Sequence, residues 1–467
     1  MSFPRYPEYK DSGVEWLGNV PRHWLVDRLK ASIVSSKNGI WGDEPKWDEN
    51  DIPCVRVADF DRRKLRVELT EPTIRNVTSR EREGRILSSG DLLLEKSGGG
   101  ESQPVGCVVL YDDERLAVCS NFVARVQLAH GLNSSFWRYV HAAAYAVRLT
   151  TGSINQTSGI QNLDQDRYFN ERAPFPPHDE QVAIANFLDR ETAKIDSLVA
   201  EQEKLIALLQ EKRQAVISHA VTKGLDPNVP MKDSGVEWLG EVPAHWTVMP
   251  IRLAARLESG HTPSRSRPDW WKDCTVPWFT LADVWQIRDG GADVVYETKE
   301  LVSELGLANS SARLLPEGTV MLSRTASVGF SAIMGVAMAT TQDFANWVCR
   351  EKLRPEFLLQ VFRSMKGEYR RLMMGSTHNT IYMPDIQAFR FALPPLPEQL
   401  RIVDYIKEKA STFDDLISEA EVAVRLLTER RTALISAAVT GQIDVRSLAN
   451  VCEEVEGTTS IKKPGFP

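Results

Sequence analysis

KDSGVEWLG fills residues 10–18 of the chain, and the same nine residues return at 232–240. Each copy stands ahead of a longer stretch that also occurs twice. PPHDEQVAIANFLDRETAKIDSLVAEQEKLIALLQEKRQAVISHAVT runs over residues 176–222. PPLPEQLRIVDYIKEKASTFDDLISEAEVAVRLLTERRTALISAAVT runs over residues 394–440. The chain is therefore predicted to contain two copies of one structural plan.

The segments between the repeated stretches have nearly equal lengths but divergent sequences. Glu180 follows Gly18 by 162 residues, and Glu398 follows Gly240 by 158 residues. Three pairs of stretches are weakly similar. They are IPCVRVADF (52–60) with VPWFTLADV (276–284), GDLLLEKSGG (90–99) with GTVMLSRTAS (318–327), and TGSINQT (151–157) with MGSTHNT (374–380). We call the repeated stretches the frame and the divergent segments between them the modules. A repeated frame that carries two different modules of similar size is expected in a protein that recognises two different targets at a fixed separation.

The short repeated phrase is predicted to be a local docking motif. Ser12, with Glu15 three residues later, matches a helix capping box, and Gly18 can close the turn. The second copy repeats this pattern as Ser234, Glu237 and Gly240. The tryptophans in and just after the two copies are expected to be packing anchors: Trp16, Trp24, Trp238 and Trp246.

The long repeated stretches are predicted to be helices with a coiled-coil seam, because apolar residues recur at heptad spacing. Proline pairs exclude helix upstream, and Gly224 and Gly441 end each stretch. Two matching seams in one chain most simply pack on each other, antiparallel if the halves are related by a pseudo-twofold axis. Two independent surface helices are the alternative. The predicted seam residues are Leu188, Ile195, Leu198, Leu205, Leu209 and Val216, followed by Ile406, Phe413, Leu416, Leu427 and Leu434.

Composition indicates a soluble intracellular protein of more than one domain. The chain has 467 residues, 42% of them hydrophobic, and a net charge of −7. No apolar run approaches the ~18 residues of a membrane span, and the N-terminus lacks a signal-peptide pattern. We therefore expect a cytoplasmic location. The six cysteines form no C-x-x-C motif, which favours reduced, unreactive thiols.

No catalytic constellation stands out in the sequence. The Asn/Asp-Pro-Pro-aromatic loop of amino-methyltransferases is missing, and so is the G-x-x-x-x-G-K-[ST] phosphate loop. Asp269 in a Pro-Asp pair, with Glu297 and Lys299, loosely matches a metal-dependent nuclease. So short a pattern arises easily by chance, and the first half has no equivalent. The sequence predicts no catalytic residues and no metal site.

This organisation resembles the specificity subunit of type I restriction–modification systems. The KDSGVEWLG phrase with its VP-x-HW continuation, the PP-x-x-EQ start of each long helix and the G-D-x-L-L element carry the resemblance, which extends to about Val445. It implies two target-recognition domains that each read one half of a split, asymmetric DNA site. It also implies a non-catalytic chain that recruits two methyltransferase subunits and the restriction subunits. S-adenosylmethionine, ATP and Mg²⁺ are then expected on those partners and no cofactor on this chain.

The predicted fold class is α+β: two globular mixed α/β target-recognition domains joined by two long helices that form an antiparallel coiled coil, with a pseudo-twofold internal repeat. A metal-dependent nuclease, or a coiled-coil scaffold with two binding modules for something other than DNA, remain the alternatives. The predicted segments are a first recognition domain (1–175), a first helix (176–224), a second recognition domain (225–393), a second helix (394–445) and a disordered tail (446–467).

Basic clusters are the candidates for DNA contacts, since Arg and Lys bind phosphates while a few polar side chains reach base edges. Lys96 of the G-D-x-L-L element, GDLLLEK, and Arg324 of the similar stretch GTVMLSR occupy matching places. Residues of the TGSINQT and MGSTHNT stretches could line the same face or form structural turns. The full candidate set is Arg62, Arg63, Lys64, Arg66, Lys96, Ser97, Arg265, Arg267, Lys272, Arg324 and Thr325.

Overall fold

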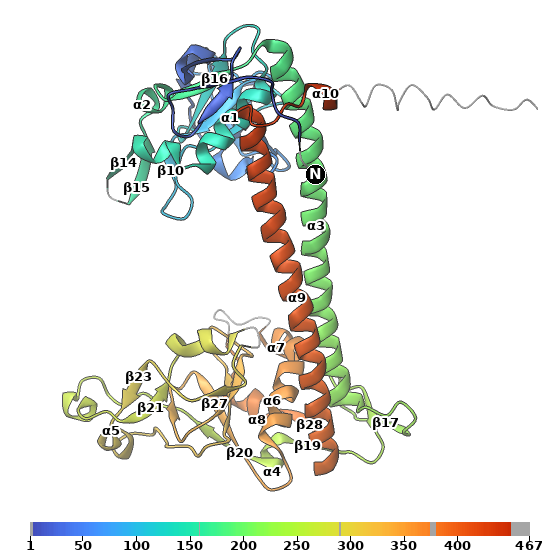
Figure 1. Ribbon diagram of the computed structural model, residues 1–467. Coiled ribbons are helices and arrows are strands. Elements are labelled where there is room, and N and C mark those ends of the chain that lie inside the picture. The colour runs from blue at the N-terminus through green and yellow to red at the C-terminus, as the bar shows by residue number, and fades with distance from the viewer. Residues whose placement is uncertain (1–2, 158, 289–290, 374–379, 450–467) are drawn as a thin grey trace, which may run out of the picture. The chain divides into compact units, whose positions relative to one another are not determined.

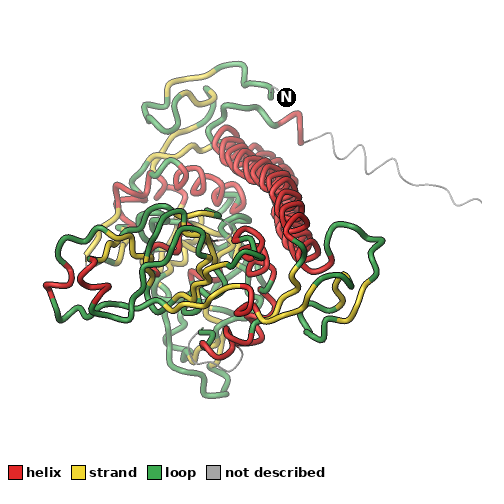
Figure 2. Tube along the Cα trace, turned by 90° about the horizontal axis from the view of Figure 1, so that it is seen from below, coloured by secondary structure: helices red, strands yellow, loops and turns green. Residues whose placement is uncertain are grey.

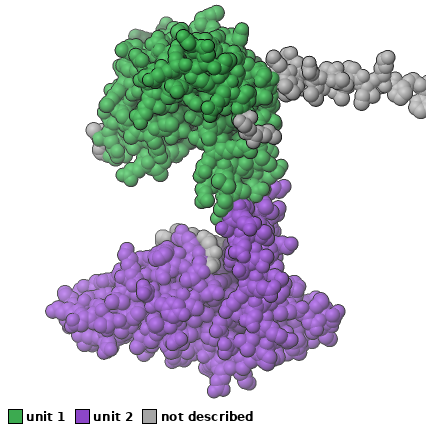
Figure 3. Space-filling model, in the orientation of Figure 1, with its two compact units in different colours: residues 1–203, 421–467 green, residues 204–420 purple. Residues whose placement is uncertain are grey.

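The chain divides into two compact units, which Figure 3 colours separately. Unit 1 comprises Met1–Glu203 and Glu421–Pro467, and unit 2 comprises Lys204–Ala420. Each unit therefore combines one globular part with the beginning of one long helix and the end of the other. The computed structural model (Figure 1) describes residues 3–157, 159–288, 291–373 and 380–449.

Two long helices match the repeated stretches. They are α3 (His178–Lys223) and α9 (Leu396–Val439), and each begins directly after its proline pair. The predicted tail starts with a short helix, α10 (Arg446–Ala449), so its first residues are ordered. The rest of that tail, 450–467, lies outside the described residues.

The globular part of unit 1 is built on a six-stranded sheet in the order β4-β13-β9-β11-β7-β6 and a three-stranded sheet in the order β12-β5-β8. Smaller sheets are β10-β15-β14, β16-β3 and β1-β2. The strands are β1 Tyr9–Asp11, β2 Asn19–Pro21, β3 Leu25–Arg28, β4 Ile33–Asn38, β5 Asp51–Val55, β6 Phe60–Asp61, β7 Arg66–Val67, β8 Ile74–Asn76, β9 Leu92–Glu95, β10 Ser97–Gly98, β11 Val108–Leu110, β12 Val118–Cys119, β13 Val123–Leu128, β14 Ile154–Thr157, β15 Ile160–Leu163 and β16 Arg172–Phe175.

Unit 2 repeats this plan with a five-stranded sheet, β20-β27-β24-β25-β22, and the sheets β23-β21-β26, β19-β28 and β17-β18. Its strands are short and joined by long loops (Figure 2). They are β17 Met231–Asp233, β18 Glu241–Pro243, β19 Thr247–Pro250, β20 Ala255–Ser259, β21 Val276–Phe279, β22 Val294–Val295, β23 Glu300–Val302, β24 Val320–Ser323, β25 Ser331–Met334, β26 Ala339–Thr340, β27 Phe344–Cys349 and β28 Arg390–Leu393.

The shorter helices belong mostly to the globular parts. The stretch 355–373 forms two helices, α6 and α7, which are separated at Met365. The α-helices are α1 Ser134–Ala146, α2 Gln165–Phe169, α4 Ile251–Ala254, α5 Glu304–Ala308, α6 Pro355–Ser364, α7 Lys366–Met373 and α8 Met383–Ala388. Single 3₁₀ turns cover Leu29–Ser32, Val57–Asp59, Leu149–Ser153, Pro268–Trp271 and Leu281–Gln286.

The ends of each variable module lie side by side. In unit 1, β3 pairs with β16 antiparallel, with Arg28 opposite Arg172. In unit 2, β19 pairs with β28 antiparallel, with Pro250 opposite Arg390. Because the chain enters and leaves each module at a strand pair of the repeated frame, the module between can vary without displacing the frame.

The docking phrase forms a tight β-turn loop, and the predicted capping box is wrong. The Ser12 hydroxyl accepts from the Val14 backbone N–H at 3.1 Å, and no helix starts there. Instead the Ser12 N–H donates to the carbonyl of Gly18, whose φ of 58° closes the loop between β1 and β2. The second copy has the same bonds. A Ser-x-x-Glu pattern specifies a cap only when helical residues follow, and here a strand follows.

Each docking phrase packs against the C-terminal end of a long helix. In unit 1 a Cβ on Gly441 would lie 2.3 Å from Pro21 and 3.1 Å from Trp24. In unit 2 a Cβ on Gly224 would lie 3.2 Å from Trp246. The two tryptophans are buried, whereas Trp16 and Trp238 are half-buried at the edge of the same cores.

The helices run antiparallel in each unit and pair reciprocally. Asp196 of α3 and Arg431 of α9 form an ion pair of 2.9 Å in unit 1. Arg213 of α3 and Asp414 of α9 form one of 2.9 Å in unit 2. These are the same two positions of the repeat with the roles of the helices exchanged. The predicted antiparallel pairing is thereby confirmed in both units.

The seam differs from the heptad prediction on one flank. Leu188, Ile195, Ile406 and Leu434 are buried, whereas Leu209, Val216, Phe413 and Leu427 are half-buried. Leu198, Leu205 and Leu416, which were predicted to lie in the seam, are exposed at 46%, 43% and 43%. In α3 the neighbouring Val199 is buried instead of Leu198. Heptad spacing locates a stripe, but the globular part that covers it decides which flank is buried.

The Glu-Gln pair at the start of each long helix joins the frame to the module. Glu180 accepts from the Trp24 indole at 2.9 Å and the Tyr6 hydroxyl at 3.0 Å, and lies 2.6 Å from the His23 ring. Gln181 accepts from the Asn133 backbone N–H ahead of α1. In unit 2 the equivalent contacts join Glu398 to His245 at 2.9 Å and Gln399 to the Arg354 N–H at 2.9 Å.

Glu180→Ala is expected to destabilise unit 1 by roughly 2–5 kcal/mol, because the buried Trp24 indole and Tyr6 hydroxyl would lose their acceptor. Glu398→Ala is the matched control. Its carboxylate pairs with a half-exposed His245, so about 1 kcal/mol or less is expected. Chemical denaturation of both variants checks this. Equal destabilisation by the two substitutions would contradict the role given to Glu180.

Candidate nucleic-acid interface

Two backbone hydrogen bonds fix the place where Lys96 leaves the main sheet of unit 1. The Lys96 N–H donates to the carbonyl of Phe122 at 2.9 Å, and the Leu163 N–H donates to the carbonyl of Lys96 at 2.8 Å. The next residue, Ser97, donates its hydroxyl to Asn162 at 2.7 Å. The structure therefore brings Lys96 and Ser97 together with the β14–β15 hairpin, whose first strand lies in the TGSINQT stretch.

A surface pocket of ≈ 480 Å³ lies beside these residues. Trp41 and Phe122 line it and are 38% and 47% exposed. Arg56, which is paired with Asp59 at 3.0 Å, and Asn121 add polar groups to its wall. Exposed aromatic faces beside hydrogen-bonding side chains can contact base edges and base methyl groups.

Unit 2 places Arg324 and Thr325 in the equivalent position. The Arg324 N–H donates to the carbonyl of Asp343 at 2.9 Å, and the Ile381 N–H donates to the carbonyl of Arg324 at 2.8 Å. Thr325 bridges to Thr380, as Ser97 does to Asn162. Thr380 thus matches Asn162 and not Thr157, so the sequence alignment of TGSINQT with MGSTHNT was out of register. Residues 374–379 lie outside the described residues.

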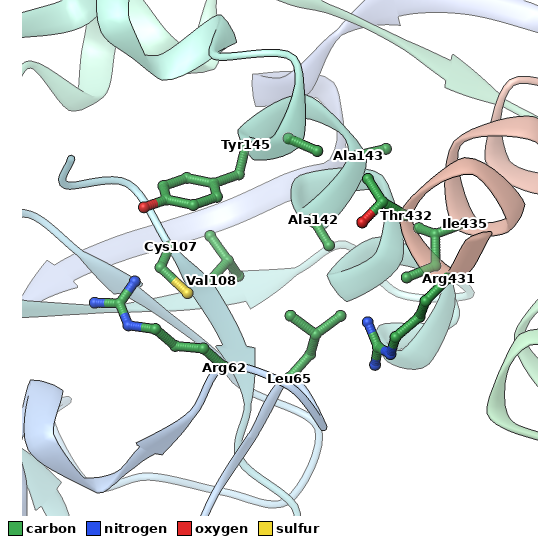
Figure 4. Close-up of a pocket in the computed structure, with 11 residues that line it drawn as sticks. Arg62, Leu65, Cys107, Val108, Ala142, Ala143, Tyr145, Arg431, Thr432 and Ile435 are labelled. Atoms are coloured by element: carbon green, nitrogen blue, oxygen red, sulfur yellow. The ribbon is translucent and has the colours of Figure 1, made fainter. Parts of the chain in front are cut away.

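Arg62 does not join Lys96 at this surface. Its guanidinium pairs with buried Glu95 at 2.8 Å and lines a separate pocket of ≈ 160 Å³, with Cys107, Leu65 and Arg431. Figure 4 shows Arg62 on one side of this pocket and Arg431, from α9, on the other. Burial raises the pKa of Glu95 above its ordinary value even beside the arginine. Arg62 is therefore held inside the unit by a carboxylate.

The other basic residues of this cluster face α3. Arg63 pairs with Glu203 at 2.6 Å, Lys64 pairs with Asp61 at 3.3 Å, and Arg66 binds Asp112. All three line a groove of ≈ 470 Å³ whose other wall includes α3 residues. The structure thus separates the 62–66 cluster from the Lys96 pocket and engages each of its cations with a carboxylate.

The basic loop of unit 2 is stacked on tryptophans. Arg265 lies 3.7 Å from the centroid of the Trp271 ring and pairs with Glu300 at 2.7 Å. Arg267 pairs with Asp269 at 3.3 Å, and Lys272 is exposed. The same loop begins at Thr262, whose hydroxyl donates to Gln342 at 2.8 Å. Because Gln342 precedes Asp343, which binds the Arg324 N–H, this bond places the start of the basic loop beside Arg324.

Sequence reasoning missed Trp41, Arg56, Asn121 and Phe122. They come from three separate loops, and only long-range strand pairing brings them to one pocket. The alignment of IPCVRVADF with VPWFTLADV was the signal that could have found Arg56, since it matches Arg56 with Thr280 at the end of a conserved strand. No comparable signal marked the others.

The loose nuclease pattern does not assemble a metal site within the described part of the chain. Asp269 is tied to Arg267, which holds the pKa of that carboxyl below its ordinary value. Among the described residues no group of three or more His, Cys, Asp or Glu side chains is placed to hold a metal ion. Nor does any described helix have the length and apolarity to cross a membrane.

The described cysteines are free thiols. Burial raises the pKa of Cys54 to about 11 and those of Cys107, Cys119 and Cys349 to about 12. Thiols with such values are almost fully protonated at neutral pH and are poor nucleophiles. Cys452 lies outside the described residues.

Comparison with known proteins agrees with this organisation. Residues 243–421 match the family described as type I restriction modification DNA specificity domain. The MjaVIII type I restriction enzyme specificity subunit of Methanocaldococcus jannaschii is 22% identical over 63% of this chain and 68% of its own length. The MjaIX specificity subunit of the same organism is 26% identical over 38% of this chain and 40% of its own.

A solved structure shares the fold. It comes from work on complex assembly and conformational transition of the type I R-M system, and it matches 90% of this chain and 98% of its own with a TM-score of 0.63 at 18% identity. The duplicated frame, the two divergent modules and the reciprocal antiparallel helices agree with these matches. The chain is thus similar in sequence to type I restriction enzyme specificity subunits, and its residues 243–421 match their DNA specificity domain.

Proposed function

We propose that this chain is the DNA-sequence-reading subunit of a type I restriction–modification complex and that it recognises a bipartite, asymmetric site, one half per unit. The observation that carries the proposal is the repeat itself. Lys96 and Arg324 occupy the same hydrogen-bonded position in two copies of one scaffold, while the side chains around them differ. One scaffold with two sets of surface side chains is what the reading of two different half-sites requires.

The chain is further proposed to recruit two methyltransferase subunits and the restriction subunits. The long helices support this because they leave large apolar side chains exposed, and such surfaces favour protein contacts. The exposed residues are Leu198, Leu205 and Leu208 on α3, and Leu416, Val422 and Leu426 on α9. S-adenosylmethionine, ATP and Mg²⁺ would be bound by those partners.

A selection experiment tests the reading of DNA. The chain, purified with its methyltransferase subunit, is mixed with a random duplex library, and bound duplexes are sequenced. Two specified blocks separated by an unspecified gap of fixed length are expected. A contiguous consensus, or no enrichment over the methyltransferase alone, would refute the proposal and favour a scaffold that binds something other than DNA.

The purified chain alone is expected neither to methylate nor to cut DNA with any divalent metal added. The nuclease alternative depends on the carboxylate of Asp269, which already forms an ion pair with Arg267. Incubation of plasmid DNA with Mg²⁺ or Mn²⁺, followed by gel electrophoresis, checks this. Cleavage that disappears in Asp269→Ala would revive the nuclease, and Asp273→Ala in the same loop is the matched control.

A further inference from the structure

We infer that one exposed carboxamide in each unit, Asn121 in unit 1 and Gln342 in unit 2, reads an A·T pair of its half-site other than the methylated one. This inference rests on the proposed function. It goes further by assigning the base-reading positions and by predicting a base pair that they specify.

Backbone hydrogen bonds show that the two carboxamides are equivalent. The residue before each donates to the end of a matching strand: Ser120 to the carbonyl of Val55 at 2.9 Å, and Thr341 to that of Phe279 at 3.1 Å. The carbonyl of the residue after each, Phe122 or Asp343, accepts from the backbone N–H of Lys96 or Arg324, as described above. Asn121 and Gln342 therefore occupy one position of a shared scaffold, fixed on both sides by main-chain bonds.

Comparison of the matched positions separates what the units share from what they do not. Both have a carboxamide at 121/342 and a cation at 96/324. They differ at the surrounding positions, which pair Trp41 with Thr262, Arg56 with Thr280, Phe122 with Asp343 and Asn162 with Thr380. The shared carboxamide and cation are expected to contact a feature that both half-sites have. The positions that differ are expected to contact the bases that distinguish the two half-sites.

The chemistry of a carboxamide points to adenine. Asn and Gln can donate to adenine N7 and accept from its N6 amino group in the major groove, a pattern that no other base pair presents. Asn121 is exposed, and no described side chain or backbone group hydrogen-bonds its carboxamide. Gln342 is also exposed; its oxygen accepts from Thr262, which leaves a second lone pair and the amide N–H groups free.

The methylated adenine itself is a poor candidate for this contact. A base that undergoes chemistry leaves the helical stack for the active site of the enzyme, which then reads its edge. The carboxamide of the specificity chain is therefore assigned to an A·T pair that stays stacked. In unit 1 the exposed rings of Trp41 and Phe122 line the same pocket as Asn121 and could contact the thymine methyl group.

The test maps methylated adenines in DNA from cells that carry the methyltransferase subunit with wild-type or variant chain. Asn121→Ala is expected to relax one A·T position of one half-site, with discrimination lowered at least about fivefold, and to leave the other half-site unchanged. Gln342→Ala is expected to do the same in the opposite half-site. Asn170→Ala, which removes an exposed carboxamide elsewhere in unit 1, should keep the wild-type motif.

The outcomes distinguish failure of this inference from failure of the proposed function on which it rests. If the wild-type chain directs no bipartite motif, the proposed function fails. If it does and Asn121→Ala keeps the full motif, or relaxes a G·C pair, the inference alone is overturned. If Asn121→Ala loses all methylation, Asn121→Gln decides: restoration of the wild-type motif by this longer carboxamide supports the assignment, and continued loss overturns it.

Discussion

Insertion of two residues into each long helix, after Lys204 and after Val422, is expected to abolish sequence-specific methylation. These are equivalent positions of the two copies. Two residues turn the rest of each helix by about 200°. In α3 the insertion lies between Asp196 and Arg213. Asp196 therefore keeps its place, whereas Arg213 is rotated away from Asp414. The apolar seam beyond the insertion then faces solvent.

Insertion of four residues at the same two positions is expected to preserve methylation and to lengthen the unread gap. Four residues turn a helix by about 400°, only about 40° past a full circle, so both ion pairs can re-form. They also lengthen each helix by about 6 Å. At about 3.4 Å per base pair, the gap should grow by one or two base pairs, while both half-site sequences stay the same.

Methylome mapping of the two insertion variants, with circular dichroism to follow helix content, distinguishes the outcomes. The four-residue variant is the matched control for the two-residue one, because both lengthen the same helices at the same positions. Intact methylation with an unchanged gap in the four-residue variant would show that the helices do not set the spacing.

Replacement of residues 29–171 with the corresponding segment of another family member is expected to exchange one half-site completely. The cut falls where Arg28 pairs with Arg172, so the strand pair β3–β16 and the contacts of Glu180 are retained. The incoming module therefore meets the same frame. The half-site read by unit 2 should not change, since no residue of Lys204–Ala420 is altered.

The reciprocal exchange of residues 251–389 is the control, because it leaves β19 and β28 intact and should alter only the other half-site. Purification of each chimaera with the methyltransferase subunit, followed by methylome mapping, gives the result. A single exchange that altered both half-sites would contradict the division of reading between the units.

The sequence predicted the frame because the frame is repeated. Identical phrases and matching heptads gave two independent observations of each feature, and the ends of α3 and α9 follow from proline pairs and glycines. The errors arose where a local pattern has two physical outcomes. Ser12 with Glu15 fits a cap or a turn, and Leu198 or Val199 can lie toward the seam until the covering surface is known.

The candidate site was harder to predict because its members are distant in sequence. The similarity of GDLLLEK to GTVMLSR predicts that Lys96 and Arg324 occupy equivalent positions, and their backbone hydrogen bonds agree with this. Arg62 and Arg63 were chosen for their charge, yet Glu95 and Glu203 neutralise them from 33 and 140 residues away. A cluster of cations in sequence predicts a phosphate-binding surface only if no carboxylate reaches it in the fold, and that information is tertiary.

The most direct measurement is a map of methylated adenines in DNA from cells that carry this chain and its methyltransferase subunit, compared with cells that carry the methyltransferase subunit alone. The structure predicts one asymmetric motif made of two specified blocks and a gap of constant length, present only when the chain is present. Methylation that occurs equally without the chain, or a motif with no gap, would contradict the proposal that two units of one chain each read half of a DNA site.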